Sequence, residues 1–251
     1  MTDPTRPDRH TSGVRSNAYC GNKLLKTVII HGQNHKGATY HIAHQLADKI
    51  GGELTEFFLP RDFGEFCIGC GNCFTSGEET CPHYSKLHTI TEAIDDSDVI
   101  ILASPVYVFH ATGAMKAFLD HYGYRWMVHR PAPGMFTKQG VCISTAAGAG
   151  MRSANKDMAD SLFFWGIAKI YRYGIGVAAI SWDTVSPRKK AGIYHKTTEL
   201  ANVIRRRNGN VHPGLRTRLW FSLMRHIKGI SDLDRWYWEI NGWTGKRRPW
   251  N

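Results

Sequence analysis

Features that would assign this chain to an export or membrane class are missing from its sequence. The first 23 residues are polar, contain two early prolines and have no apolar run, so we expect a leader over residues 1–22 but no secretory signal. The most apolar segments, residues 99–109 and 163–180, are too short or too charged to cross a bilayer. We therefore expect a cytoplasmic protein, in which clustered cysteines bind metal or take part in redox chemistry more often than they form disulfides.

The sequence also lacks internal repeats, long low-complexity tracts and two glycine motifs of nucleotide-binding proteins. Neither G-x-G-x-x-G nor G-x-x-x-x-G-K-Ser/Thr occurs where a strand enters a helix, which argues against dinucleotide-binding and P-loop folds. Hydrophobic residues make up 42% of the 251 residues and charged residues 21%. This composition is ordinary for a globular protein and predicts one full core.

Alternating apolar patterns run through the middle of the chain. Short β-branched runs that read as buried strands alternate with segments whose apolar residues recur at helical spacing. This order predicts a doubly wound α/β domain with a five-stranded parallel sheet over residues 23–206. We expect strands at 23–32, 52–60, 96–105, 138–146 and 168–180, and helices at 39–52, 112–124, 151–167 and 186–207, the last capped by Ser186 with Pro187 at its first position.

A basic, tryptophan-rich extension follows over residues 207–251. The net charge of the chain is +11, and residues 205–251 contain eleven Lys and Arg against three acidic residues. Large aliphatic residues recur every fourth position and predict one amphipathic helix: Leu215, Leu219, Leu223 and Ile227. Four of the eight tryptophans lie beyond them, so the extension must pack on another surface.

Three loops that follow predicted strands carry permissive or polar residues. Ligands of open α/β sheets bind beyond the carboxyl ends of the strands. Residues 31–39 lead into a helix with glycines, positive charge and a hydroxyl, as a phosphate site requires, although Thr39 could merely cap that helix. Residues 104–116 contain Pro105 and Tyr107, and residues 145–150 are small; alone these would be a rigid turn with a core tyrosine and a plain glycine-rich loop.

Four of the six cysteines lie between residues 67 and 82, in a segment that we expect to be a loop rather than a helix. They are spaced Cys67-x2-Cys70-x2-Cys73-x7-Cys81, followed by Pro82. This run resembles a ferredoxin-type iron–sulfur motif more than the paired knuckles of zinc sites. Zinc, reduced structural thiols and disulfides remain alternatives, whereas Cys20 and Cys142 are expected to be bystanders.

The order of these loops resembles the NADPH-dependent FMN reductase group of flavodoxin-like proteins and, within it, the iron–sulfur flavoproteins. The resemblance covers residues 24–180 and implies FMN, a [4Fe-4S] cluster on the four cysteines and NAD(P)H as donor. The first loop, Gly32-Gln33-Asn34-His35-Lys36, departs from the G-S-P-R-K frequent in the family, and His121 stands where members often have Arg. The implied FMN ligands are Gln33, His35, Lys36 and Thr39 for the phosphate, and Pro105, Val106, Tyr107, Thr145, Ala146 and Gly148 for the ring.

The leading hypothesis is an FMN-dependent NAD(P)H oxidoreductase that passes electrons between FMN and the cluster. A small molecule or a protein would be the electron acceptor, and His110 and His121 are candidate proton donors, although both could be ordinary surface or satisfied histidines. Alternatives are a cluster-free flavin or quinone reductase and a zinc- or thiol-stabilised basic module for nucleic acid. The extension could form a homodimer or homotetramer, lie on a membrane surface or cover the flavin.

Overall fold

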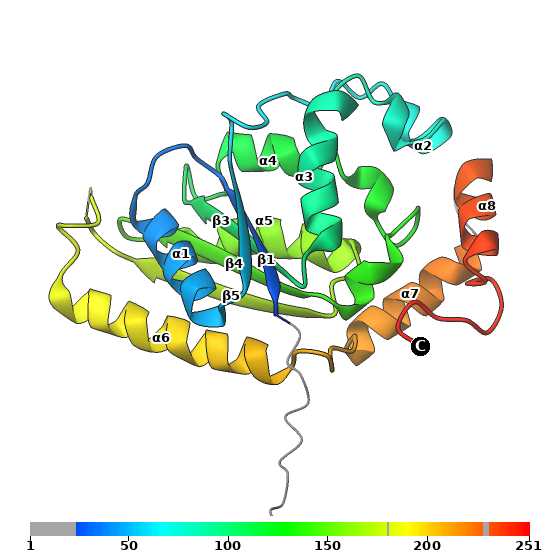
Figure 1. Ribbon diagram of the computed structural model, residues 1–251. Coiled ribbons are helices and arrows are strands. Elements are labelled where there is room, and N and C mark those ends of the chain that lie inside the picture. The colour runs from blue at the N-terminus through cyan, green and yellow to red at the C-terminus, as the bar shows by residue number, and fades with distance from the viewer. Residues whose placement is uncertain (1–23, 180, 228–230) are drawn as a thin grey trace, which may run out of the picture.

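A single parallel sheet organises the protein. The computed structural model describes residues 24–179, 181–227 and 231–251, so the expected leader and Cys20 lie outside it. The strands are β1 (Lys26–His31), β2 (Glu53–Phe58), β3 (Val99–Pro105), β4 (Gln139–Ala146) and β5 (Lys169–Gly176). Their order is β2-β1-β3-β4-β5, and every neighbouring pair is parallel (Figure 1). The predicted doubly wound, flavodoxin-like sheet is confirmed.

Helices cover both faces of the sheet (Figure 1). One apolar core lies under α1 (Ala38–Ile50) and α6 (Pro187–Arg206), which begins with the predicted Ser186 cap. The other lies under α3 (Tyr84–Asp96), α4 (Gly113–Asp120) and α5 (Met151–Phe164). Six of the seven residues of β3 are buried, as a strand covered on both faces requires. Short 3-10 turns at Gly123–Arg125 and Pro133–Thr137 complete this face.

The segment between β2 and β3 contains one helix that was not predicted and one prediction that needs correction. Helix α3 was not predicted, yet Leu87, Ile90 and Ile94 recur at helical spacing and are buried against the sheet. The cysteine segment is not purely a loop, because it contains the short helix α2 (Asn72–Thr75) and a 3-10 turn at Glu78–Thr80. Glycines surround these turns, and such turns are too short to give a periodic signal in the sequence.

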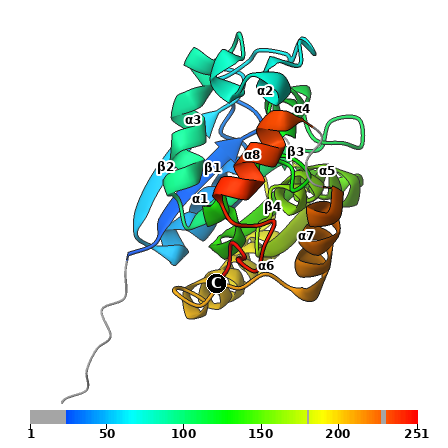
Figure 2. The same ribbon diagram turned by 90° about the vertical axis from the view of Figure 1, so that its right-hand side faces the viewer.

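The extension contributes α7 (Leu215–Ile227) and α8 (Asp232–Ile240), which pack on one end of the α/β domain (Figure 2). Phe221, Trp238 and Trp243 are buried there against Phe136 and Phe163. Trp238 and Trp243 thus pack as expected, whereas Trp236 is 55% exposed and the predicted aliphatic stripe of α7 faces solvent. Within the described residues, no helix combines the length and apolar character that a bilayer crossing requires.

Candidate functional site

A cavity of about 230 Å³ opens at the carboxyl ends of the strands. Eight of the ten side chains expected at the flavin line it, together with residues that the sequence analysis did not single out. Val177 and Ala179 belong to this second group. They follow β5, which ends at Gly176, but the predicted strand 168–180 enclosed them, so the rule applied to the other strand ends missed them. The lining is Gln33, His35, Gly37, Ala38, Thr39, Pro105, Val106, Tyr107, Thr145, Ala146, Ala147, Val177 and Ala179.

One end of this rim cavity is the N-terminus of α1. The helix begins after Gly37, and no side chain caps its first N–H groups. Thr39 instead lies inside the helix, where its buried hydroxyl is 2.6 Å from the Thr145 hydroxyl. The capping alternative for Thr39 is therefore wrong. Unsatisfied N–H groups and the positive end of the helix dipole leave a place suited to an anionic group.

The other end is formed by the loops after β3 and β4. Tyr107 is 55% exposed and its hydroxyl donates to Gln33 Oε1 over 3.2 Å, so it is not a core tyrosine. The Val106 N–H donates to the Thr145 carbonyl. Val108 and Phe109 are exposed and have positive φ angles of 48° and 67°. A β-branched residue rarely adopts this conformation, and such strain concentrates at ligand-contacting loops.

Close packing fixes the two loops relative to each other. Gly150 precedes α5 with a φ of 95°, and a Cβ there would approach Val106 Cγ1 to 2.6 Å and Phe109 Cα to 3.0 Å. A larger residue would therefore push the loops apart. The small residues after β4 thus preserve the shape of the cavity and leave the main chain that lines it accessible.

Four other candidate residues lie outside the rim cavity. Lys36 Nζ lies 5.0 Å from the ring centre of Tyr40, away from the lining, and Gly148 is also absent from the lining. His110 pairs with Asp157 over 3.0 Å at the surface. His121 is buried beside the cysteine segment, where Nδ1 donates to the Ala117 carbonyl over 2.8 Å. Neither histidine contacts the rim cavity.

The four cysteines line a separate cavity of about 110 Å³. None of the described cysteines is disulfide-bonded. Burial raises the pKa of the Cys73 thiol to about 11, and the neighbouring Cys81, Cys67 and Cys70 add to this shift. Four thiolates in this space would repel one another. A bound multivalent metal would offset this repulsion and so favour the ionised form of the thiols. This donor set fits an iron–sulfur cluster.

Two histidines that the sequence analysis did not place here complete the cysteine cavity. Ligand atoms of Cys81, His83 and His121 lie within 4.8 Å of one another, and His83 Nδ1 is 2.9 Å from His121 Nε2. His83 stands two residues after the last cysteine, which was a usable signal. His121 comes from the end of α4, and only the fold brings it here. Cys–His–His is also a donor set for zinc.

A third cavity, of about 400 Å³, lies between the Glu78–Thr80 turn and α8. Its two arginines are engaged by carboxylates: Arg125 by Asp95, and Arg130 by Asp234 over 2.6 Å. Both guanidinium groups thus already bind carboxylates, so the cavity is not an anion-binding site.

Comparison with known proteins identifies the family. Residues 25–178 match the family described as NADPH-dependent FMN reductase. An iron–sulfur flavoprotein of Archaeoglobus fulgidus is 35% identical over 135 residues, which are 52% of this chain and 57% of that protein. An FMN-dependent NADH:quinone oxidoreductase of Herminiimonas arsenicoxydans is 31% identical over 87 residues, 31% of this chain and 42% of that protein. The chain thus matches about half the length of these relatives.

Solved structures support the same fold. A flavone reductase aligns with a TM-score of 0.56 at 14% identity and covers 76% of this chain and 66% of its own. An FMN-dependent NADH-azoreductase from Bacillus anthracis, solved in complex with FMN, aligns with a TM-score of 0.53 at 12% identity and covers 71% and 99%. The sheet order, the rim cavity and a family match over more than half of the chain agree. The chain belongs to the NADPH-dependent FMN reductase family.

Proposed function

We propose that this protein is an FMN-dependent NAD(P)H oxidoreductase that relays electrons between FMN in the rim cavity and a [4Fe-4S] cluster on Cys67, Cys70, Cys73 and Cys81. The convergence on one cavity of eight residues that the family resemblance implies as FMN ligands carries the proposal. When bound, FMN links two-electron donors to one-electron acceptors. The same chain supplies a four-thiol pocket in the segment that follows β2.

Different residues of the rim cavity bind the two ends of FMN. The open N–H groups of α1 and the hydroxyl of Thr39 bind the phosphate. Pro105 and Tyr107 hold one side of the ring, and Ala146 leaves the backbone near it uncovered. Main-chain N–H groups at this edge would stabilise negative charge on the reduced ring. No side chain in the lining is required as a catalytic acid or base.

Anaerobically purified protein tests both halves of the proposal. We expect bound FMN, iron and labile sulfide, and bleaching of the flavin absorbance by NADH or NADPH. Thr39→Val should lower FMN occupancy, whereas Thr198→Val, at a half-buried hydroxyl that donates to Tyr194 O on α6, should leave it unchanged. Protein that cannot be reconstituted with FMN would refute the flavin site.

The geometry of Cys81, His83 and His121 supports a second candidate, a cluster-free flavin or quinone reductase with zinc in the cysteine cavity. Elemental analysis separates the two. Zinc without labile sulfide, abolished by His121→Ala, favours this candidate. Iron with sulfide that survives His121→Ala favours the cluster. In both cases we expect an oligomer, a homodimer or a homotetramer, which sedimentation would test.

A further inference from the structure

Helix α8 of the extension reaches back to the cysteine segment. Ser231, which caps α8, also donates from its hydroxyl to the carbonyl of Phe74 over 3.1 Å. Phe74 and Ser231 are 157 residues apart in the chain. Figure 2 shows α8 beside α2, and the Phe74 ring packs on His129 at 4.8 Å.

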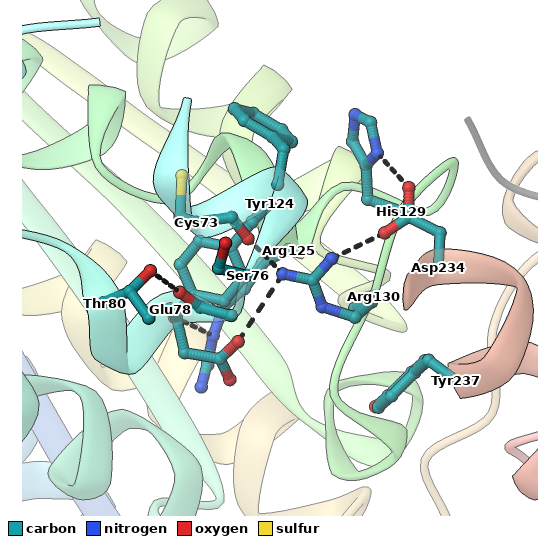
Figure 3. Close-up of polar contacts among 12 residues, drawn as sticks. Cys73, Ser76, Glu78, Thr80, Tyr124, Arg125, His129, Arg130, Asp234 and Tyr237 are labelled. Atoms are coloured by element: carbon teal, nitrogen blue, oxygen red, sulfur yellow. Dashed lines mark hydrogen bonds and ion pairs between the residues drawn. The ribbon is translucent and has the colours of Figure 1, made fainter. Parts of the chain in front are cut away.

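A buried ion pair strengthens this connection (Figure 3). Arg130 Nη1 donates to Asp234 Oδ1 over 2.6 Å, and Nη2 donates to the carbonyl of Cys73. His129 Nδ1 donates to the other carboxylate oxygen over 2.8 Å. Asp234 is fully buried and the Arg130 side chain is 5% exposed. The buried charge of each side chain is compensated by the other, so the pair fixes the position of Arg130 against the cysteine segment.

The two carbonyls that receive these bonds belong to α2. This helix has four residues, and a helix of that length gains no stability of its own in water. Its last carbonyls have no partner inside the helix. Side chains from outside the segment therefore determine where Cys73 lies relative to the other three thiols.

We propose that Ser231, Asp234 and Arg130 form a clamp through which the extension positions the metal-binding segment. Asp234 and Ser231 lie beyond the family match, which ends at residue 178. They are positioning residues, since they act on the cysteines through the backbone of α2. The clamp itself depends only on the contacts described, while the consequence for metal rests on the proposed function.

Hydrogen–deuterium exchange of residues 67–82 tests the clamp in full-length protein. Asp234→Asn and Ser231→Ala should each raise exchange in this segment about tenfold, the effect of one lost net hydrogen bond. Ser186→Ala is the matched control, because it removes the N-cap of α6, which does not contact the cysteines. Unchanged exchange in both clamp variants would overturn the clamp, and Ser231→Ala keeps the test valid if Asp234→Asn does not fold.

Iron content separates the clamp from the proposed function. If wild-type protein holds iron, the clamp variants should lose part of it at unchanged FMN occupancy, and full retention would contradict the role in metal binding. If wild-type protein holds no metal while exchange still rises in the variants, the cluster proposal fails and the clamp stands.

A second, independent observation is the exposed apolar face of α7. Leu215, Leu219, Leu223 and Ile227 are 73%, 62%, 53% and 50% exposed and lie four residues apart. Every charged side chain of this helix is cationic: Arg216, Arg218 and Arg225. An aliphatic stripe on a helix without acidic residues is the pattern of helices that lie at the surface of anionic bilayers.

The structure assigns this stripe to the surface of an anionic lipid bilayer rather than to a second copy of the chain. The helix that carries the stripe has three arginines and no carboxylate, and anionic headgroups would neutralise this charge, which a second copy of the same helix would not. The stripe would enter the interface while α8 and the domain remain outside it. This surface is separate from both cavities.

Co-sedimentation with vesicles tests the assignment. We expect binding to vesicles of phosphatidylcholine and phosphatidylglycerol in equal parts and little binding to phosphatidylcholine alone. The double variant Leu219→Gln/Leu223→Gln should weaken binding at least about tenfold, while Leu54→Gln, at an exposed leucine of β2, should not. Absence of binding, or a wild-type dimer that the double variant dissociates, would overturn the assignment.

Discussion

The rim cavity and the cysteine cavity owe their shapes to different parts of the chain. The rim cavity is formed by loops that leave buried parallel strands. The loops after β3 and β4 pack closely against each other, where the backbone of Gly150 meets the side chain of Val106. The cysteine cavity lies on a segment with one four-residue helix, which is held by side chains from elsewhere. The topology of the sheet makes the rim cavity rigid, whereas a buried ion pair supports the cysteine cavity.

This difference means that the two cavities should fail separately. Damage to the sheet rim should release FMN and leave the metal in place, and damage to the cysteine segment should do the reverse.

The largest effect should come from Cys73→Ala. The variant removes one of the two partly buried thiols among the four candidates, so iron and labile sulfide should fall to background while FMN occupancy is unchanged. Iron, sulfide and flavin analysis of one sample checks this. Cys142→Ala applies the same change to a thiol inside β4 and should retain the metal. Equal loss of FMN in Cys73→Ala would show that the cavities are not independent.

Asp234→Ala should be the most destabilising change in the extension. It removes the buried counter-ion of Arg130, which then faces only the Glu78 carboxylate at 3.6 Å, and breaking a buried pair in this way typically costs about 3–5 kcal/mol of unfolding free energy. Chemical denaturation monitored by tryptophan fluorescence measures it. Glu199→Ala, which breaks an exposed pair with Lys196, should change stability little. A small effect of Asp234→Ala would mean that the extension does not depend on this pair.

Thr39→Val should weaken FMN binding about tenfold, the value of a lost hydrogen bond to a charged group. The change is nearly isosteric, and the Thr145 hydroxyl remains. Titration of the apoprotein with FMN gives the dissociation constant, and iron content should be unaffected. Unaltered affinity would place the phosphate away from the start of α1.

The smallest effect should be a difference in pH response between the two regions. Burial lowers the pKa of His31 at the end of β1, an effect that its hydrogen bond with Glu56 only partly offsets. Its contribution to stability is therefore complete above the usual histidine pKa of about 6.5 and is lost as pH falls below it. His31→Gln should flatten this part of the stability profile.

The clamp should be insensitive in the same range. Burial acts to raise the pKa of Asp234, but His129 and Arg130 outweigh it and hold the pKa below its usual value. The stability that Asp234 contributes is present above the ordinary Asp pKa and is lost only as pH falls through the lowered one. The protection factors of residues 67–82, which are exchange rates corrected for the intrinsic pH dependence of amide exchange, should thus stay constant between pH 7 and about 5; a fall in protection there would contradict the assignment.

Sequence patterns predicted the sheet and the rim because both follow local rules. Strand β3 reads as a continuous apolar run, and the residues after each strand must meet at one edge. The capping role for Thr39 was plausible by sequence, but the helix begins after Gly37 and the Thr39 hydroxyl instead meets that of Thr145, far along the chain.

The extension was harder to predict. Periodicity indicated α7 correctly but not which face is buried, because Phe221 and Met224 fill the core while the more regular leucine stripe stays outside. Nothing local connects Asp234 to Cys73. Their link through Arg130 exists only after the chain has folded back on itself.

That link has a consequence during synthesis. The ribosome makes Phe74 157 residues before Ser231, so the four thiols emerge long before the helix that braces them. A nascent chain therefore presents this segment unbraced and accessible until α8 has been made. The cluster proposed for these thiols can thus be inserted before the brace forms.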